Sequence, residues 1–263
     1  MTDPVLTLTV LGSATPHPGA DNPCSGYLLT HGRTRVWIDA GSGTLGPLQR
    51  HTPLDGLDAI WISHLHADHC ADLLTAYYGA LYADIRLAAP IPLYGPPGIA
   101  DRLAHFLTNT ARRSHVEDAF AVTELHDGYQ ATHGALTLTS RAVAHGIPAF
   151  ALRAEAGGRS LVYSGDTAPC TALDELAADC DLLLCEADGT PPEPGTDPVH
   201  HTPQDAGATA ARARARRLVV THVGRHTTPQ QAVDLAATRY DGPIRHADPG
   251  AVLTLDRTAT QGG

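Results

Sequence analysis

The densest group of side chains able to hold a metal ion is the segment HLHADH at 64–69, in which four of six residues are imidazoles or carboxylates. It directly follows an apolar run, DAIWIS, that predicts a strand. Where a strand passes into a loop, His64 and His66 can face one way while Asp68 and His69 turn toward a neighbouring point. Imidazole and carboxylate ligands together suit zinc, and two such groups side by side suit two metal ions about 3.5–4 Å apart.

Three more side chains of ligand type end predicted strands later in the chain: His145 in AVAHGIPAF, Asp166 in YSGDT and His222 in VVTHVG. Each is weak evidence alone, because single histidines often lie at the surface and a Ser-Gly-Asp-Thr step is often a turn. Together with HLHADH and with WIDAGSGT at 37–44, they stand in the order of the motifs of the metallo-β-lactamase superfamily. From about residue 5 to residue 255, the chain resembles that superfamily.

The resemblance implies a set of metal ligands. By analogy with the superfamily, one metal ion is held by His64, His66 and His145, a second is held by Asp68, His69 and His222, and Asp166 bridges both. The implied cofactors are two Zn²⁺ ions, with Mn²⁺ or Fe²⁺ as alternatives. A redox di-iron centre is disfavoured, because relatives of that kind carry Glu where this chain carries His66.

Within the superfamily, the chain is most similar to the branch that contains ribonuclease Z and small phosphodiesterases. The segments that carry this similarity are LTVLGSATPHPGADNPCSGYLL near the start, LYGPPG at 93–98, SGDT, CEA, and HTPQDAGATA at 201–210. In that branch, a histidine that binds no metal assists the leaving group. The matching residue here is His201, with Glu186 as the carboxylate that orients it. His200 is an alternative, but the following Thr202-Pro203 step fits the branch pattern with His201.

These residues predict a metal-dependent hydrolase. Two metal ions that share a water lower its pKa from 15.7 toward about 7, which gives a metal-bridging hydroxide at neutral pH. Asp68 at the edge of a metal can accept a proton from that water, and the metals stabilise charge that grows on phosphoryl or carbonyl oxygens. A departing alkoxide also needs a proton, which an imidazole held by a carboxylate can donate. His201 and Glu186 therefore favour a phosphodiesterase that acts on a cyclic or short phosphodiester.

Three other functions are weighed against this one. The main alternative is a hydrolase of a carboxyl derivative (lactone, thioester or amide), for example in secondary metabolism, since such relatives typically manage without the extra histidine. A binding protein that merely kept the fold is disfavoured by the complete set of seven ligands. Processing of tRNA 3′ ends is disfavoured too. Ribonuclease Z carries a long tRNA-gripping arm between its third metal histidine and its bridging aspartate, whereas only residues 146–165 lie there in this chain.

Composition limits the partners further. The chain has 263 residues, with 18 basic residues that are all arginine and 28 acidic ones, for a formal net charge of −10. Proteins that grip a long polyanion usually present a basic face, so extended nucleic acid is disfavoured as a partner. A small anionic substrate fits, because two metal dications would dominate the field inside the site. A homodimer is compatible with the sequence.

The same composition gives an expected location. Five cysteines, an odd number without C-x-x-C spacing, predict reduced thiols. The sequence shows no signal-peptide pattern and no apolar run near the roughly 18 residues that a membrane helix needs. We therefore expect a cytoplasmic protein with no membrane partner.

The elements that must position these residues follow a two-part pattern of strands and then helices. Strands are expected at 5–12, 25–32, 34–41 and 58–63, helices at 69–83 and 97–113, further strands within 119–166, a helix near 170–178, strands at 181–187 and 217–222, and helices that begin at Thr202-Pro203 and Thr228-Pro229. The loop at 188–200, rich in Pro and Gly, is either a lid or a plain surface loop. No repeat or long linker divides the chain, so we expect one domain over 1–263. Its predicted fold is an α+β four-layer αββα sandwich.

Overall fold

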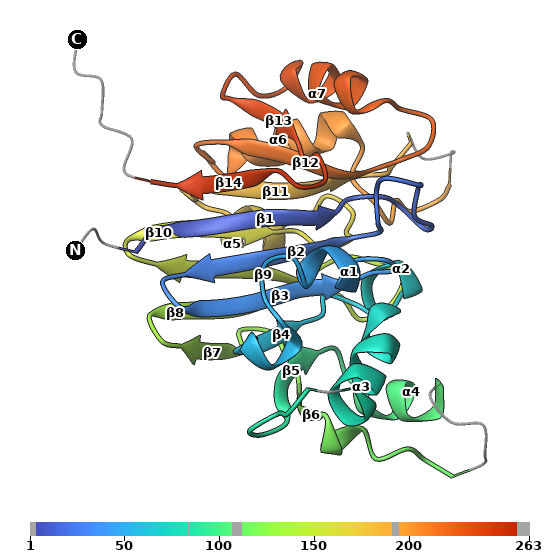
Figure 1. Cartoon of the computed structure of the whole chain (residues 1–263). Coiled ribbons are helices and arrows are strands. Elements are labelled where there is room, and N and C mark those ends of the chain that lie inside the picture. The colour runs from blue at the N-terminus through green and yellow to red at the C-terminus, as the bar shows by residue number, and fades with distance from the viewer. Residues whose placement is uncertain (1–3, 84, 107–111, 191–194, 257–263) are drawn as a thin grey trace.

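The computed structural model describes residues 4–83, 85–106, 112–190 and 195–256. Two seven-stranded sheets face each other, and helices cover their outer faces (Figure 1). The predicted four-layer αββα sandwich is therefore confirmed. None of the described helices is long and apolar enough to cross a lipid bilayer.

The first sheet comes from the first half of the chain, apart from one late strand. In spatial order its strands are β14 (Val252–Leu255), β1 (Leu6–Gly12), β2 (Gly26–His31), β3 (Thr34–Ala40), β4 (Ala59–Trp61), β5 (Ile91–Gly95) and β6 (Phe120–Glu124). Strands β14 to β3 pair antiparallel, and β3 to β6 pair parallel. The helices of this half are α1 (Leu45–Leu48), α2 (Ala67–Cys70), α3 (Asp72–Tyr82) and α4 (Ile99–Phe106), with short 3-10 turns at Leu54–Gly56 and Val116–Asp118.

The second sheet comes from the second half of the chain. In spatial order its strands are β13 (Ile244–His246), β12 (Leu218–Val223), β11 (Leu182–Ala187), β10 (Arg159–Tyr163), β9 (Phe150–Ala156), β8 (Leu136–Ala142) and β7 (Gln130–His133). Its helices are α5 (Thr171–Leu176), α6 (Pro203–Arg212) and α7 (Pro229–Ala237). Helices α6 and α7 begin as predicted, because Thr202 and Thr228 each form a capping box ahead of the proline.

The core has three parts because successive side chains of a strand point to opposite faces. Between the sheets lies one apolar cluster, to which β3 contributes Ile38. The neighbouring Trp37 faces the other way, into the cluster beneath α3. On the second sheet, Leu161 faces the central cluster and Val162 packs under the outer helices. Strands buried on both faces read as nearly continuous apolar runs, which explains why they were recognised in the sequence.

Some elements differ from the prediction. The helix expected at 69–83 is two helices, α2 and α3, and the one expected at 97–113 ends at Phe106, with 107–111 outside the described residues. Four strands were not recognised: β5, β7, β13 and β14. Each has three to five residues, too few for an alternating pattern to stand out from chance.

The strand directions bring the candidate residues to one edge of the sandwich. Strands β8, β10, β11 and β12 run in the same direction, so the segments that follow them emerge together. Strand β4 of the other sheet opens onto the same edge, since the backbone NH of Phe150 donates to the carbonyl of Ser63 at 3.0 Å. The site therefore lies between the two sheets, where their carboxyl ends meet.

Candidate metal centre

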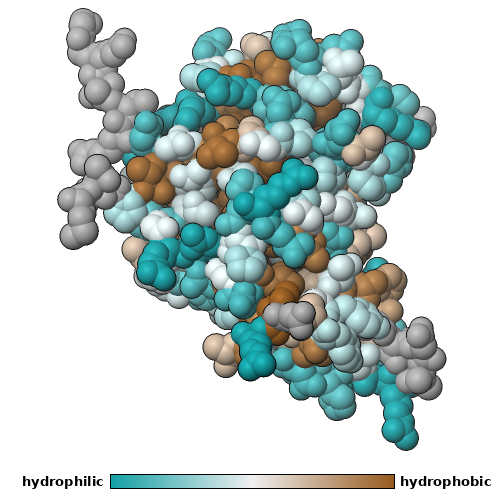
Figure 2. Space-filling view, viewed as in Figure 1, coloured by the Kyte–Doolittle hydropathy of each residue, from teal (hydrophilic) through white to brown (hydrophobic). Residues whose placement is uncertain are grey.

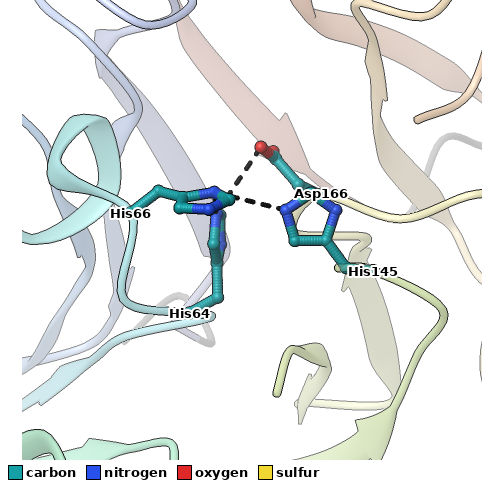
Figure 3. Close-up of side chains that lie close together, drawn as sticks. All are labelled: His64, His66, His145 and Asp166. Carbon is teal, nitrogen blue, oxygen red and sulfur yellow. Dashed lines mark hydrogen bonds and ion pairs between the residues drawn. The ribbon is translucent and has the colours of Figure 1, made fainter. Parts of the chain in front are cut away.

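The first cluster of candidate ligands contains His64, His66, His145 and Asp166, whose ligand atoms lie within 4.8 Å of one another (Figure 3). Nδ1 of His66 lies 3.0 Å from Nε2 of His64 and 3.3 Å from Nε2 of His145. Nε2 of His64 lies 3.6 Å from Oδ2 of Asp166. Around a tetrahedral zinc ion with bonds near 2.1 Å, neighbouring ligand atoms are roughly 3.4 Å apart. The spacing of this cluster fits one such ion.

The second cluster contains Asp68, His69 and His222. Nε2 of His222 lies 3.1 Å from Oδ2 of Asp68 and 3.4 Å from Nε2 of His69. All three side chains are buried; Asp68 and His69 lie in α2, and His222 lies in β12 of the second sheet. These separations also match the edges of a metal coordination shell.

Asp166 lies between the clusters. Its Oδ1 is 3.3 Å from Nε2 of His69, and its Oδ2 is 3.7 Å from Nε2 of His222. Burial alone would raise the pKa of Asp166, but His222 and His69 hold it well below its usual range, so the group is an anion. Its Oδ1 is buried without a hydrogen-bond partner among the described residues. A buried anionic oxygen left in this state is costly unless a cation meets it, so the donor set fits metal ions.

The protonation of the first cluster agrees with this fit. Burial lowers the pKa of His64 well below its usual value and also lowers that of His66. Both rings are therefore neutral near pH 7, and the neutral imidazole is the form that binds a metal. The structure thus brings together all seven residues that the sequence singled out as ligands.

Asp39 holds the second cluster in place. Its carboxylate accepts hydrogen bonds from the NH and Oγ of Ser63 at 2.7 and 2.8 Å, from the hydroxyl of Tyr163 at 2.7 Å, and lies 2.7 Å from Nδ1 of His69. Because Nδ1 of His69 faces this carboxylate, Nε2 is the atom left to face the site. Burial and the charge of Asp39 raise the pKa of Tyr163 well above its usual value, so the phenol keeps its proton and donates.

Two residues of the site have strained backbones. Asp39 has φ of 51° and His222 has φ of 47°, both in the left-handed region that favours glycine. Each such residue costs of the order of 1–3 kcal/mol and persists only where its surroundings fix it. Strain at these two positions marks them as selected for where their side chains point.

The histidine beside Glu186 is His200, which corrects the expectation for His201. Nδ1 of His200 lies 2.9 Å from Oε1 of Glu186 and 4.0 Å from Oδ2 of Asp166. Its ring contacts the ring of His145 edge-on and stacks on that of His222. Burial would lower the pKa of His200, but its bond to Glu186 and the nearby acids raise it to about 9.

His201 points the other way and is fully buried. Its Nδ1 lies 2.6 Å from the carbonyl oxygen of Thr167, and its Nε2 lies 3.1 Å from Oγ1 of Thr209 in α6. With both ring nitrogens engaged and no exposed surface, it cannot reach a substrate. Neighbouring residues of an extended segment face opposite sides, so only one of the two histidines can face the site.

Glu186 lies beside the site, but the ring that it contacts is that of His200 and not, as predicted, that of His201. It is fully buried in β11, and its carboxylate accepts from the backbone NH groups of Thr167 and Asp188, both at 3.0 Å. These bonds fix the carboxylate and thereby the ring of His200. The loop at 188–200 also contributes the carbonyl of Val199, which lies 2.9 Å from Nδ1 of His145. Residues 191–194 of that loop, considered above as a lid, lie outside the described residues.

Comparisons with known proteins give matches along most of the chain. A family model described as the beta-lactamase superfamily domain matches residues 34–223. Uncharacterized protein Rv1339 of Mycobacterium tuberculosis is 37% identical over 244 residues, which cover 91% of this chain and 88% of that protein. Ribonuclease Z of Mycobacterium bovis is 30% identical over 274 residues, which cover 91% of this chain and 95% of that protein. The crystal structure of the metallo-beta-lactamase fold protein YhfI from Bacillus subtilis matches with a TM-score of 0.83 at 26% identity, over 96% of this chain and 100% of that one.

Proposed function

Because the chain belongs to the beta-lactamase superfamily and is a metal-dependent hydrolase, we propose that it is a phosphodiesterase acting on a cyclic or short phosphodiester. The seven residues His64, His66, Asp68, His69, His145, Asp166 and His222 would hold two metal ions, with zinc the best match to the donor set. Metal ions bound there would supply Lewis acidity toward the phosphoryl oxygens and an activated water as nucleophile.

The observation that carries the proposal is the pair of His200 and Glu186 beside Asp166. Nδ1 of His200 lies 2.9 Å from Oε1 of Glu186. Its other ring nitrogen, Nε2, has no hydrogen-bond partner among the described residues. The side chain of His200 is 24% exposed, so a substrate held at the metal ligands can reach it. An alkoxide leaving a phosphodiester is a strong base, and a proton from an imidazole in this position would assist its departure.

The remaining steps fall to residues already placed. Asp68 lies at the rim of the second cluster and would accept the proton of the attacking water. Glu186 would keep Nδ1 of His200 bonded and stabilise the ring when it is charged. His200 would donate from Nε2 to the departing oxygen and recover its proton from water after product release. Both groups adjoin His222: Nε2 of His222 lies 3.1 Å from Oδ2 of Asp68, and its ring stacks on that of His200, so the acid and the base would act at the same centre.

The short connection between His145 and Asp166 supports a small substrate. Strands β9 and β10 pair antiparallel through a turn at Gly157 and Gly158, so residues 146–165 form a hairpin within the second sheet. No arm that could grip a tRNA extends from it. The basic residues at the end of α6 and just after it do not form an anion site either, because Arg212, Arg214 and Arg216 pair with acidic neighbours.

A substrate panel tests the proposal against hydrolysis of carboxyl derivatives. Metal-loaded protein is assayed with alkyl and cyclic nucleotide phosphodiesters, and in parallel with aryl esters, thioesters and lactones. We expect the highest kcat/KM on phosphodiesters, with activity lost on chelation and restored by metal. Preference for a lactone or thioester would overturn the proposal and favour the carboxyl alternative.

A further inference from the structure

An apolar pocket adjoins the metal centre on the outer side of the HLHADH segment. It lies between α2 and α3 on one side and α4 on the other and has a volume of about 90 Å³. Leu65 and Ala67, the chain neighbours of His66, are part of its wall, so the rim of the pocket and the rim of the metal site meet at one exposed residue, His66. Figure 2 shows hydrophobic residues at the surface in this region of the molecule.

The side chains that line the pocket indicate which class of ligand it binds. Leu74 and Leu103 form an apolar floor, and Phe106, 69% exposed, stands at the edge. Arg102 is the charged residue of the wall, and it makes no ion pair with any residue in the part of the chain that the structure describes. Apolar side chains with one aromatic ring and one free guanidinium suit a planar ring that carries hydrogen-bond acceptors.

We propose that this pocket binds the nucleobase of a nucleoside phosphodiester, with Arg102 stacked on or bonded to the base. The inference rests on the proposed function and names its substrate class. At about 90 Å³ the pocket takes one edge of the base and leaves the rest of the ring at its mouth, and the sugar would pass over His66 to put the phosphodiester at the metal ligands. Cys70, which is part of the pocket wall, holds the backbone of His66 in place, since its thiol donates to the carbonyl of His66 at 3.2 Å.

Arg102 favours a base over an alkyl chain as the group that the pocket binds. An alkyl chain would gain nothing from Arg102, whereas a guanidinium over a heteroaromatic face gains both stacking and charge–dipole attraction.

The test measures how much the base contributes to binding, with no turnover involved. Titration calorimetry on metal-loaded protein compares adenosine 5′-monophosphate with ribose 5-phosphate, which differ only in the base. Stacking of a base should make the nucleotide bind roughly 5- to 150-fold more tightly than the sugar phosphate. Two variants remove the subsite: Arg102→Ala takes away the cation, and Ala71→Trp fills the pocket from a partly exposed wall position.

In both variants, the advantage of the nucleotide should fall below about 3-fold while the affinity for ribose 5-phosphate stays the same. Arg239→Ala, which removes an exposed arginine next to α7, is the matched control and should keep the full advantage. Equal affinities for the two ligands in the unmodified protein, or an advantage that survives both pocket variants, would overturn the inference.

A parallel assay with a base-free dialkyl phosphodiester separates this inference from the proposed function. Cleavage of that diester without any preference for the nucleotide would refute the pocket and leave the phosphodiesterase standing. A nucleotide preference that depends on Arg102, in a protein that cleaves no phosphodiester, would support the pocket and refute the phosphodiesterase.

Discussion

Nδ1 of His200 lies 2.9 Å from Oε1 of Glu186, in a segment whose next residue, His201, faces the opposite side. One peptide unit thus separates a histidine that faces the metal ligands from one that belongs to the core. Each histidine can be replaced by alanine separately. We expect the His200 variant to lose catalytic rate and the His201 variant to lose stability.

Replacement of His200 should slow catalysis according to the leaving group. A ribose or alkyl oxygen leaves as a strong base and needs a proton, whereas a nitrophenolate leaves readily without one. His200→Ala should therefore lose roughly 10²–10⁴-fold in kcat on an alkyl phosphodiester and much less on a nitrophenyl phosphodiester. Steady-state kinetics on both substrates, with metal content measured in parallel, give the two losses in kcat. Equal losses on both would assign His200 to substrate positioning, and no loss on either would remove the main support for a phosphodiesterase.

Replacement of His201 should reduce stability. His201→Ala removes the bonds to Thr167 and Thr209 and leaves a hole beside α6, which should lower the free energy of unfolding by roughly 2–4 kcal/mol. Urea unfolding of the metal-free protein measures this. His200→Ala serves as the control, because its partly exposed ring should cost far less. A folded His201→Ala protein of full stability and greatly reduced activity would contradict the assignment.

Each of the two ligand clusters should bind one metal ion. The purified protein should contain about two metal ions per chain, and chelation should abolish activity. His145→Ala removes a ligand of the first cluster while leaving Asp68, His69 and His222 intact, so elemental analysis should find about one ion. Protein that takes up no metal would refute the whole centre. Two tightly held ions in His145→Ala would show that His145 is not a ligand.

Asp39 should affect metal affinity through its contact with Nδ1 of His69. Asp39→Asn keeps the shape of the side chain and removes the charge that faces Nδ1 of His69. Metal affinity should fall roughly 10–100-fold, the usual effect of losing such a partner. Competition with a chromogenic chelator measures it. Tyr163→Phe is the matched variant, since it removes one bond to Asp39 without changing the carboxylate, and it should have the smaller effect.

The hairpin of β9 and β10 predicts poor processing of precursor tRNA. Residues 146–165, all of them described, form no arm between His145 and Asp166 that would hold the body of a tRNA. Incubation with a precursor carrying a 3′ trailer should give little product compared with a short phosphodiester at equal enzyme concentration. Accurate and efficient 3′ cleavage would mean that another surface binds the tRNA.

The sequence was most informative where function depends on local spacing. The geometry of the HLHADH segment could be predicted, because four ligand side chains in six residues can be oriented around metal ions in only a few ways. His145, Asp166 and His222 could be placed only by their order in a known family, since nothing local shows that they meet.

The errors came from relationships between distant parts of the chain. His200 and His201 are equivalent in a local pattern, and what separates them is contact with Glu186 and with Thr209, which depends on how α6 packs. The segment WIDAGSGT was noticed, but the role of Asp39 was not, because its partners Ser63, His69 and Tyr163 are 24, 30 and 124 residues away. The apolar pocket likewise joins helices whose contact no local signal predicts.

The pairing of β14 with β1 has a consequence for biosynthesis. Residues 6–12 leave the ribosome well before their partner, residues 252–255, which comes last among the described elements. Until then, β1 has one unpaired edge, and an open edge invites pairing with another chain. Ribosome-bound or truncated chains that stop before Val252 should therefore depend on chaperones, and the first sheet should be completed only once residues 252–255 are available to pair with β1.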